Sequence, residues 1–234
     1  MQVGEPVAEG WALYTRFWRH LLPIAFVVYV VISLITLLFT EIGGVIGGLV
    51  ALIVSIAGVF LLQASLVEAV ADVRDGRADL TLAETVSRAY GHLWSVAGAG
   101  LLAGLGIAFG LVLLIVPGLF LLTIWSLIVP VIVLESVPAM KSFGRSRALV
   151  RGYGWTVFGV VMVTFLAALV VEIALSILLH GLSLGLDRYL SNVIGNTLIA
   201  PFIAATWTSM YFRLKEASEP ASDAPPSGAA YTDA

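Results

Sequence analysis

The stretch from Val96 to Leu134 reads VAGAGLLAGLGIAFGLVLLIVPGLFLLTIWSLIVPVIVL, and it contains no charged residue. As one continuous α-helix it would be about 58 Å long, roughly twice the thickness of the hydrocarbon core of a bilayer. The stretch must therefore cross a membrane twice, and Pro117-Gly118 is the turn that the sequence offers between the two crossings.

The composition of the whole chain agrees with a membrane protein. Of its 234 residues, 60% are hydrophobic and 12% are charged, against about 45–50% and 25% in soluble domains. The apolar residues suffice for about six spans of 20 residues each. We expect one integral membrane domain over residues 1–215 and a disordered cytoplasmic tail over residues 216–234, which is too polar to bury a core. The chain has no cysteine, which excludes disulfides and thiol catalysis.

Short basic and aromatic motifs precede long apolar runs at three places. They are Arg16-Phe-Trp-Arg-His20, Arg88-Ala-Tyr-Gly-His92 and Arg151-Gly-Tyr-Gly-Trp155, and they start 72 and 63 residues apart. Each motif ends a segment of the kind that lies as a helix in the membrane interface. We predict an all-α, polytopic six-helix transmembrane bundle made of three repeats of an interfacial helix plus a transmembrane hairpin. The predicted repeats cover about 5–68, 80–135 and 136–213.

Local signals place the boundaries of these elements. Glu41-Ile-Gly-Gly44 interrupts the first hairpin, and Thr81-Leu-Ala-Glu84 is a capping box that starts an interfacial helix over about 81–94. Ser136 with Pro138 indicates the start of the third interfacial helix. The predicted spans are about 21–40, 45–66, two within 96–134, 155–179 and 193–212.

The Lys and Arg residues test this helix order. Eleven of the twelve fall on one side of the six predicted crossings, and only Arg188 falls on the other. Loops on the cytoplasmic side of a membrane carry an excess of Lys and Arg. We therefore predict a multi-pass protein with both termini in the cytoplasm.

A segment in the middle of the chain carries a resemblance to a known family. It reads VPGLFLLTIWSLIVPVIVLE over Val116–Glu135 and AMKSFGRSRALVRG over Ala139–Gly152. This segment resembles the membrane domain of bacterial glycerophosphoryl diester phosphodiesterases and its stand-alone relatives. The resemblance implies a six-helix fold in the inner (cytoplasmic) membrane of a bacterium. We expect no phosphodiesterase barrel here, so no catalytic residue is carried over.

Glu172 is the one ionisable residue well inside a predicted span. A carboxylate there is costly unless it is paired, hydrated or protonated. It could contact an ion, a proton or a substrate, or lie close enough to the outer surface to reach water. We expect a third arrangement, a hydrogen bond to a neighbouring helix, in which case leucine at this position would cost stability.

Other charged residues lie at the predicted cytoplasmic surface. Glu68 and Glu135 end the second and fourth spans, and we expect them to pair with Arg88 and Arg151 and so brace the fold. A further group of basic residues could instead hold lipid headgroups. The candidates for a structural or headgroup-binding role are Arg16, Arg88, Arg145, Arg151, Glu68 and Glu135.

Two kinds of residue could shape the interior of the bundle. Glycines spaced four apart, such as Gly43 with Gly47 and Gly106 with Gly110, allow helices to approach closely within the chain. Pro130 and Pro201 lie within the fourth and sixth spans and could kink them around a central site.

These observations favour a non-enzymatic integral membrane protein. We expect it to bind membrane lipids, anionic ones above all, or an unidentified membrane or cytoplasmic protein. No metal, cofactor or nucleic acid is expected as a ligand. The alternative is a small transporter or channel component with an intramembrane site near Glu172. A hydrated cavity reaching Glu172 would favour transport, and a packed interior would favour a scaffold.

Overall fold

The structure is a computed structural model that describes residues 2–179 and 187–218. The described residues form eight helices and no strand, and six helical stretches are long and apolar enough to cross a membrane. The predicted all-α, six-span architecture is confirmed. The helices are α1 (Gly4–Ile42), α2 (Gly44–Val73), α3 (Leu82–Leu113), α4 (Ile115–Ile124), α5 (Ile128–Glu135), α6 (Ala139–Val150), α7 (Gly154–Leu179) and α8 (Asp187–Ser218).

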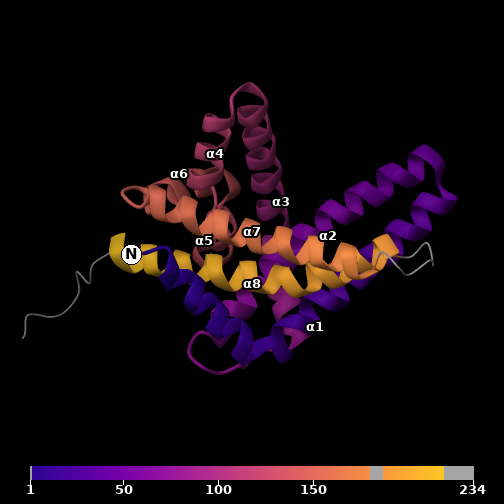
Figure 1. Cartoon of the computed structure of the whole chain (residues 1–234), viewed down its shortest axis with the longest axis horizontal. Coiled ribbons are helices and arrows are strands. Elements are labelled where there is room, and N and C mark those ends of the chain that lie inside the picture. The colour runs from indigo at the N-terminus through magenta and orange to yellow at the C-terminus, as the bar shows by residue number, and fades with distance from the viewer. Residues whose placement is uncertain (1, 180–186, 219–234) are drawn as a thin grey trace, which may run out of the picture.

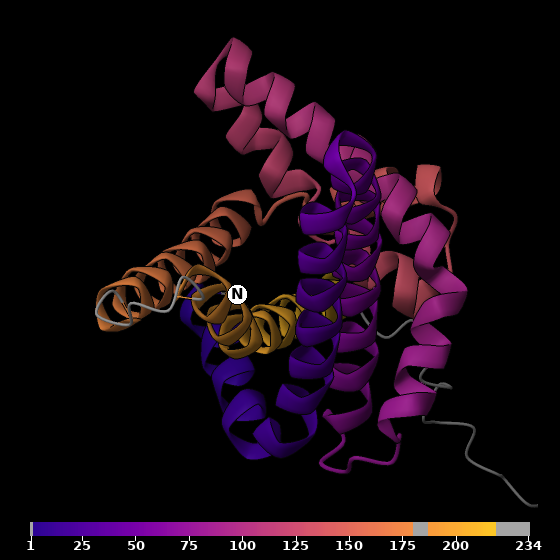
Figure 2. The same cartoon turned by 90° about the vertical axis from the view of Figure 1, so that its right-hand side faces the viewer.

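The helices pair as α1–α2, α3–α4 and α7–α8, and the three pairs extend in different directions. In Figure 1, α7 and α8 lie side by side across the molecule while the α3–α4 hairpin rises away from them. The turned view in Figure 2 again separates the α3–α4 tip from the α1–α2 hairpin. Helix α8 packs against α1, α2 and α7 and so joins two of the hairpins, while α3 of the remaining hairpin packs against α2 and α5.

The segments expected to be interfacial helices differ from one another. Helix α1 bends at Phe17 (φ −113°, ψ 22°), so the part before it is a helix with its own direction, as Figure 2 shows. The second segment does not stand apart, because α3 runs without interruption from Leu82 through Trp94 to Leu113. No proline or cap separates Trp94 from the apolar run, so nothing ends the helix there. The third segment, α6, is separate and ends in a turn at Gly152 (φ +88°). The threefold repeat stays a prediction.

Several predicted boundaries are confirmed. The α1–α2 turn lies at Gly43 and Gly44, where φ of Gly44 is +51°. At the start of α3, the Thr81 backbone N–H donates to Glu84 Oε2 at 2.9 Å, and the Glu84 N–H donates to Thr81 Oγ1 at 3.3 Å. Ser136, however, does not cap the next helix. It ends α5 in the left-handed conformation (φ 51°), and α6 begins three residues later, after Pro138.

The turn of the second hairpin is not at Pro117-Gly118. It lies at Leu114, which is extended (φ −156°, ψ 138°). Pro117 falls in the first turn of α4, where its missing N–H would have no helical partner in any case. Gly118 instead serves helix packing, since a Cβ atom on Gly110 would lie 3.0 Å from Gly118 Cα.

Pro130 breaks the fourth span rather than bending it. The span is interrupted between Ile124 and Ile128, and Pro130 is the third residue of α5. Its ring would collide with the carbonyl group of Ser126 if the helix continued. Within a bilayer the freed carbonyl groups need partners inside the chain. Ser146 Oγ of α6 donates to the Ile124 carbonyl oxygen at 2.7 Å, and thus closes part of the break. Pro201, in contrast, lies inside the unbroken α8.

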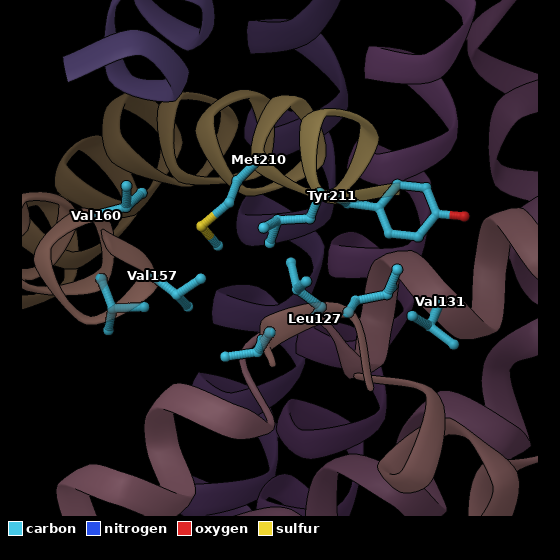
Figure 3. Packing of buried hydrophobic residues seen from close by; sticks show 10 residues of the cluster. Leu127, Val131, Val157, Val160, Met210 and Tyr211 are labelled. Carbon is cyan, nitrogen blue, oxygen red and sulfur yellow. The ribbon is translucent and has the colours of Figure 1, made fainter. Parts of the chain in front are cut away.

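The buried side chains gather where the helices cross. In Figure 3, Met210 of α8 lies on the side of Val157 of α7, while the Tyr211 ring points the other way, towards Val131 of α5. Leu127 lies between the two groups. Two further clusters join α2, α3 and α5, and α1, α2 and α8. Many large apolar side chains elsewhere on the spans are exposed, as expected for surfaces that face lipid.

The contact between α1 and α8 depends on Gly10. A Cβ atom at this position would lie 2.6 Å from Thr206 Cα, so the two backbones can approach only without a side chain. We predict that Gly10→Ala lowers the free energy of unfolding by about 1–3 kcal/mol through overpacking. The readout is thermal unfolding of the purified protein in detergent.

Gly98 provides the matched control for Gly10→Ala. It also lies inside a helix, but a Cβ atom there has no neighbour within 4 Å. Gly98→Ala should be neutral or stabilising by up to about 1 kcal/mol, from helix propensity alone. Equal effects of the two substitutions would contradict the proposed α1–α8 packing.

Candidate functional site

Ion pairs gather the ends of several helices around the C-terminal turns of α8. Arg213 Nε lies 2.7 Å from Glu9 Oε2, and its Nη1 lies 3.1 Å from Glu5 Oε2. Arg74, after α2, pairs with Glu216 at 2.7 Å and stacks over the Phe212 ring at 3.9 Å. We call this part of the molecule the basic end. It comprises residues 4–19, 74–88, 135–155 and 211–218.

Helix α8 thus extends past the span predicted for it. Glu216, placed at the start of the expected disordered tail, lies in the last turns of α8 and contacts Arg74. The helix continues because residues 213–218 have good helix formers and no proline or glycine. The remainder of the predicted tail, residues 219–234, lies outside the described part of the chain.

Glu135 is the most heavily bonded carboxylate of the basic end. Arg145 Nε donates to Glu135 Oε2 at 2.8 Å and Arg145 Nη2 donates to Oε1 at 3.0 Å. The Tyr211 hydroxyl donates to Oε1 at 2.9 Å, and Lys215 Nζ lies 4.0 Å away. The prediction that Arg151 pairs with Glu135 is wrong, because Arg145 takes that place. Arg151 lies beyond the last turn of α6, whereas Arg145 lies within the helix and reaches back to the end of α5.

Glu68 is half-buried near the end of α2. It lies close enough to Arg88 and His92 of α3 for electrostatic attraction. No ion pair within 4 Å joins Glu68 to another residue in the described part of the chain, so the expected Glu68–Arg88 contact is long-range rather than direct.

Glu172 lies exposed on α7, seven residues before that helix ends. Its nearest feature on α8 is Gly195, where a Cβ atom would be 3.3 Å from Glu172 Oε2. With the side chains that the structure describes, which exclude those of residues 40–42 and 179–192, it makes neither a hydrogen bond nor an ion pair. The expected hydrogen bond to a neighbouring helix is therefore not found there, and the position fits a carboxylate close to the hairpin tip.

A cavity of about 360 Å³ lies where α1, α2, α5, α7 and α8 meet. Its walls are mostly apolar, but Trp207 Nε1 donates to Thr164 Oγ1 at 3.2 Å beside it. It extends to Ala168, one turn before Glu172, and Glu172 itself is not part of the lining. The polar side chains of the lining are Tyr29, Gln63, Thr164, Asn196 and Trp207.

Gln63 is not among the site residues predicted from the sequence. This side chain is exposed within α2 and lines the cavity. The sequence does mark this position, since Gln63 is the one amide side chain in the run from Val45 to Val67, which has no charged residue. Polar side chains within spans usually face the bundle interior or a cavity, and Gln63 follows that rule.

The sequence also contains Gly181-Leu-Ser-Leu-Gly185, which has the G-x-S-x-G spacing of a hydrolase nucleophile turn. That turn requires a strand before the serine, whereas helix α7 precedes this segment and ends at Leu179. The segment itself lies outside the described residues. The motif therefore has no supporting structural context.

Most basic side chains of the basic end have no carboxylate partner. Arg74, Arg145, Arg213 and Lys215 lie within 4 Å of one. The others form no ion pair with any residue that the structure describes, although Arg16 stacks on Phe17 at 5.2 Å and Arg19 on Trp18 at 5.4 Å. These are Arg16, Arg19, Arg77, Arg88, Lys141, Arg147 and Arg151.

Comparison with known proteins gives no further guide. No family model, curated protein or solved structure matches the chain. The resemblance to the phosphodiesterase membrane domain therefore stays a prediction. Among the described residues, no group of three or more His, Asp or Glu could hold a metal ion.

We predict that Glu135→Gln destabilises the fold. The side chain of Glu135 is only 14% exposed, and neutralising it leaves Arg145 without its charged partner. Hydrogen bonds to charged groups contribute about 1.5–3 kcal/mol, so a loss of that size is expected in thermal unfolding. Glu216→Gln is the matched control, because Glu216 is 66% exposed and such pairs contribute about 0–1 kcal/mol. A smaller effect of Glu135→Gln than of Glu216→Gln would refute the anchoring role.

Leucine at position 172 was expected from the sequence to lower stability, and the position of Glu172 in the structure predicts the opposite. Since no described side chain pairs with the carboxylate, Glu172→Leu should leave the free energy of unfolding unchanged or raise it, because a carboxylate within a membrane span is unfavourable. Thermal unfolding of the Leu and Gln variants in detergent measures this. A marked loss of stability in the Leu variant alone would show that Glu172 has a required polar partner.

Proposed function

We propose that this protein is a non-enzymatic integral membrane protein that binds anionic lipid at its basic end, in the cytoplasmic membrane of a bacterium with both termini in the cytoplasm. The observation that carries the proposal is the set of seven basic side chains that form no ion pair within 4 Å with a carboxylate of the described residues. The anionic leaflet surface attracts each such residue with about 1 kcal/mol.

Aromatic side chains at the same end support this proposal. Trp94 and Trp155 are 81% and 87% exposed, and Trp11 and Trp18 are about half exposed. Exposed tryptophans of this kind concentrate at the level of the lipid headgroups. Trp11, Trp18 and Trp155 belong to the basic end, and Trp94 follows it along α3, six residues after Arg88.

Vesicles of defined composition test the proposal. The protein reconstituted in phosphatidylcholine with about one third phosphatidylglycerol should unfold at a higher temperature than in pure phosphatidylcholine, because the anionic headgroups neutralise the basic end. The difference should shrink at high salt, which screens exposed charges. Equal unfolding temperatures in the two lipids at low salt would refute anionic-lipid binding.

A small transporter or channel component is the second candidate. The cavity between the hairpins favours it, since Gln63 and Asn196 bring amide groups into a membrane-spanning bundle. Transporters place such sites between related helix hairpins. Against it, Glu172 does not line this cavity, and the polar cluster around Glu135 is fully bonded. Lipid binding is therefore the function that the arrangement supports better.

A further inference from the structure

A second hollow region lies between α4 and the junction of α6 with α7. It consists of two adjoining cavities of about 590 and 670 Å³. Both are lined by Phe120 and Ile124 of α4 and by Gly152 and Gly154 of the junction, so they form one continuous groove. We call it the α4–α7 groove. Helix α4, which forms one of its walls, belongs to the hairpin that rises away from α7 and α8 in Figure 1.

The two ends of the α4–α7 groove differ in chemistry. Towards the hairpin tip its wall is apolar, with Val116 and Leu119 of α4 opposite Phe158 of α7. At the other end it is lined by Arg147 and Arg151. Both arginines are exposed, and neither forms an ion pair with another residue of the described chain.

We propose that the α4–α7 groove binds one anionic phospholipid, with its phosphate between Arg147 and Arg151 and one acyl chain along α4. This inference rests on the proposed function and locates the anionic-lipid site in this groove. Arg147 lies in the last turn of α6 and Arg151 is the residue after that helix, and both line the same cavity. Arginine is well suited to phosphate because its planar guanidinium group can donate two parallel hydrogen bonds.

The apolar wall distinguishes a phospholipid from a soluble anion. From Ile124 to Val116 the wall extends about 12 Å along α4, which a free phosphate or a soluble sugar phosphate would leave uncovered. Phe120 and Val116 are 56% and 76% exposed, and α4 belongs to a candidate membrane span. A bilayer lipid carries both an anionic head and chains that cover such a wall.

Contacts of α6 with α4 and α5 fix the walls of the groove. Arg145 on α6 pairs with Glu135, and Ser146 donates to the Ile124 carbonyl oxygen at 2.7 Å. These contacts fix α6 against α4 and α5 while Arg147 and Ala148 stay exposed in the groove. A prearranged site loses less entropy when a ligand binds. Gly152, with no side chain and with φ of +88°, keeps the two cavities connected.

The test uses the full chain in mild detergent, titrated with dioleoylphosphatidylglycerol and observed by native mass spectrometry. The parent protein should bind one such lipid more tightly than dioleoylphosphatidylcholine. The double variant Arg147→Gln/Arg151→Gln should bind it about 30-fold more weakly, since each arginine contributes about fivefold. Arg77→Gln/Lys141→Gln is the matched control. It removes two basic side chains that do not line the groove and should change the affinity of the groove for this lipid less than threefold.

A second variant blocks the groove and leaves every charge in place. Ala148 is exposed and lines it, so Ala148→Phe should displace the lipid without disturbing the core. Soluble glycerol phosphate should not compete with the lipid. Competition by glycerol phosphate at equal concentration would overturn the phospholipid assignment in favour of a free phosphate site.

The outcomes separate the two proposals. If the double variant and Ala148→Phe both bind phosphatidylglycerol within threefold of the parent, the groove is not the lipid site, although the anionic-lipid preference of the parent would still support the proposed function. If the parent itself shows no preference for phosphatidylglycerol in detergent or in vesicles, the proposed function fails and this inference fails with it. A dimer that Ala148→Phe dissociates would identify a second copy of the chain as the occupant instead.

Discussion

The contact between Glu135 and Arg145 is the interaction on which the rest of the basic end depends. Through Glu135 it joins the end of α5 to α6, and through the Tyr211 hydroxyl it joins both to α8. Helix α8 in turn holds the N-terminal part of α1 through Glu9 and the residue after α2 through Arg74. A partly buried carboxylate that accepts three or more hydrogen bonds from cations and a phenol holds its neighbours in defined directions. The diverging hairpins are thereby tied together at one end only.

The basic side chains of this end fall into two groups, those that pair with carboxylates of the chain and those that do not. Arg145 and Arg213 form ion pairs with carboxylates of the chain. Arg147 and Arg151, on the same helix or its end, are left to the surroundings. The difference follows from position around α6, since the side that packs against α5 meets Glu135 and the other side opens into the α4–α7 groove. One short helix therefore both closes the bundle and presents the charges that we propose bind lipid.

The break in the fourth span links the fold to this groove. Pro130 ends the helical hydrogen bonding between α4 and α5, so that α4 can follow α3 away from the bundle. The carbonyl group freed at Ile124 is bonded by Ser146 of α6, in keeping with the need to satisfy the backbone inside a membrane. The divergence of α4 from α7 is what leaves room for a groove between them.

The sequence by itself determined the number of spans, the helix start at Thr81 and the turn at Gly43-Gly44. These depend on local chemistry, namely the length of apolar runs, a side chain that caps its own helix and a glycine with positive φ. Residue types also predicted that Glu135 would be braced by an arginine.

Only the tertiary structure decided that Arg145, and not Arg151, pairs with Glu135. The two arginines have the same chemistry and differ only in their position relative to α6. The tertiary structure likewise decided that Pro130 breaks its span, that Glu172 has no partner among the described residues, and that Gln63 lines a cavity. Each of these depends on which helix lies opposite, and that is set by packing between segments distant in the chain.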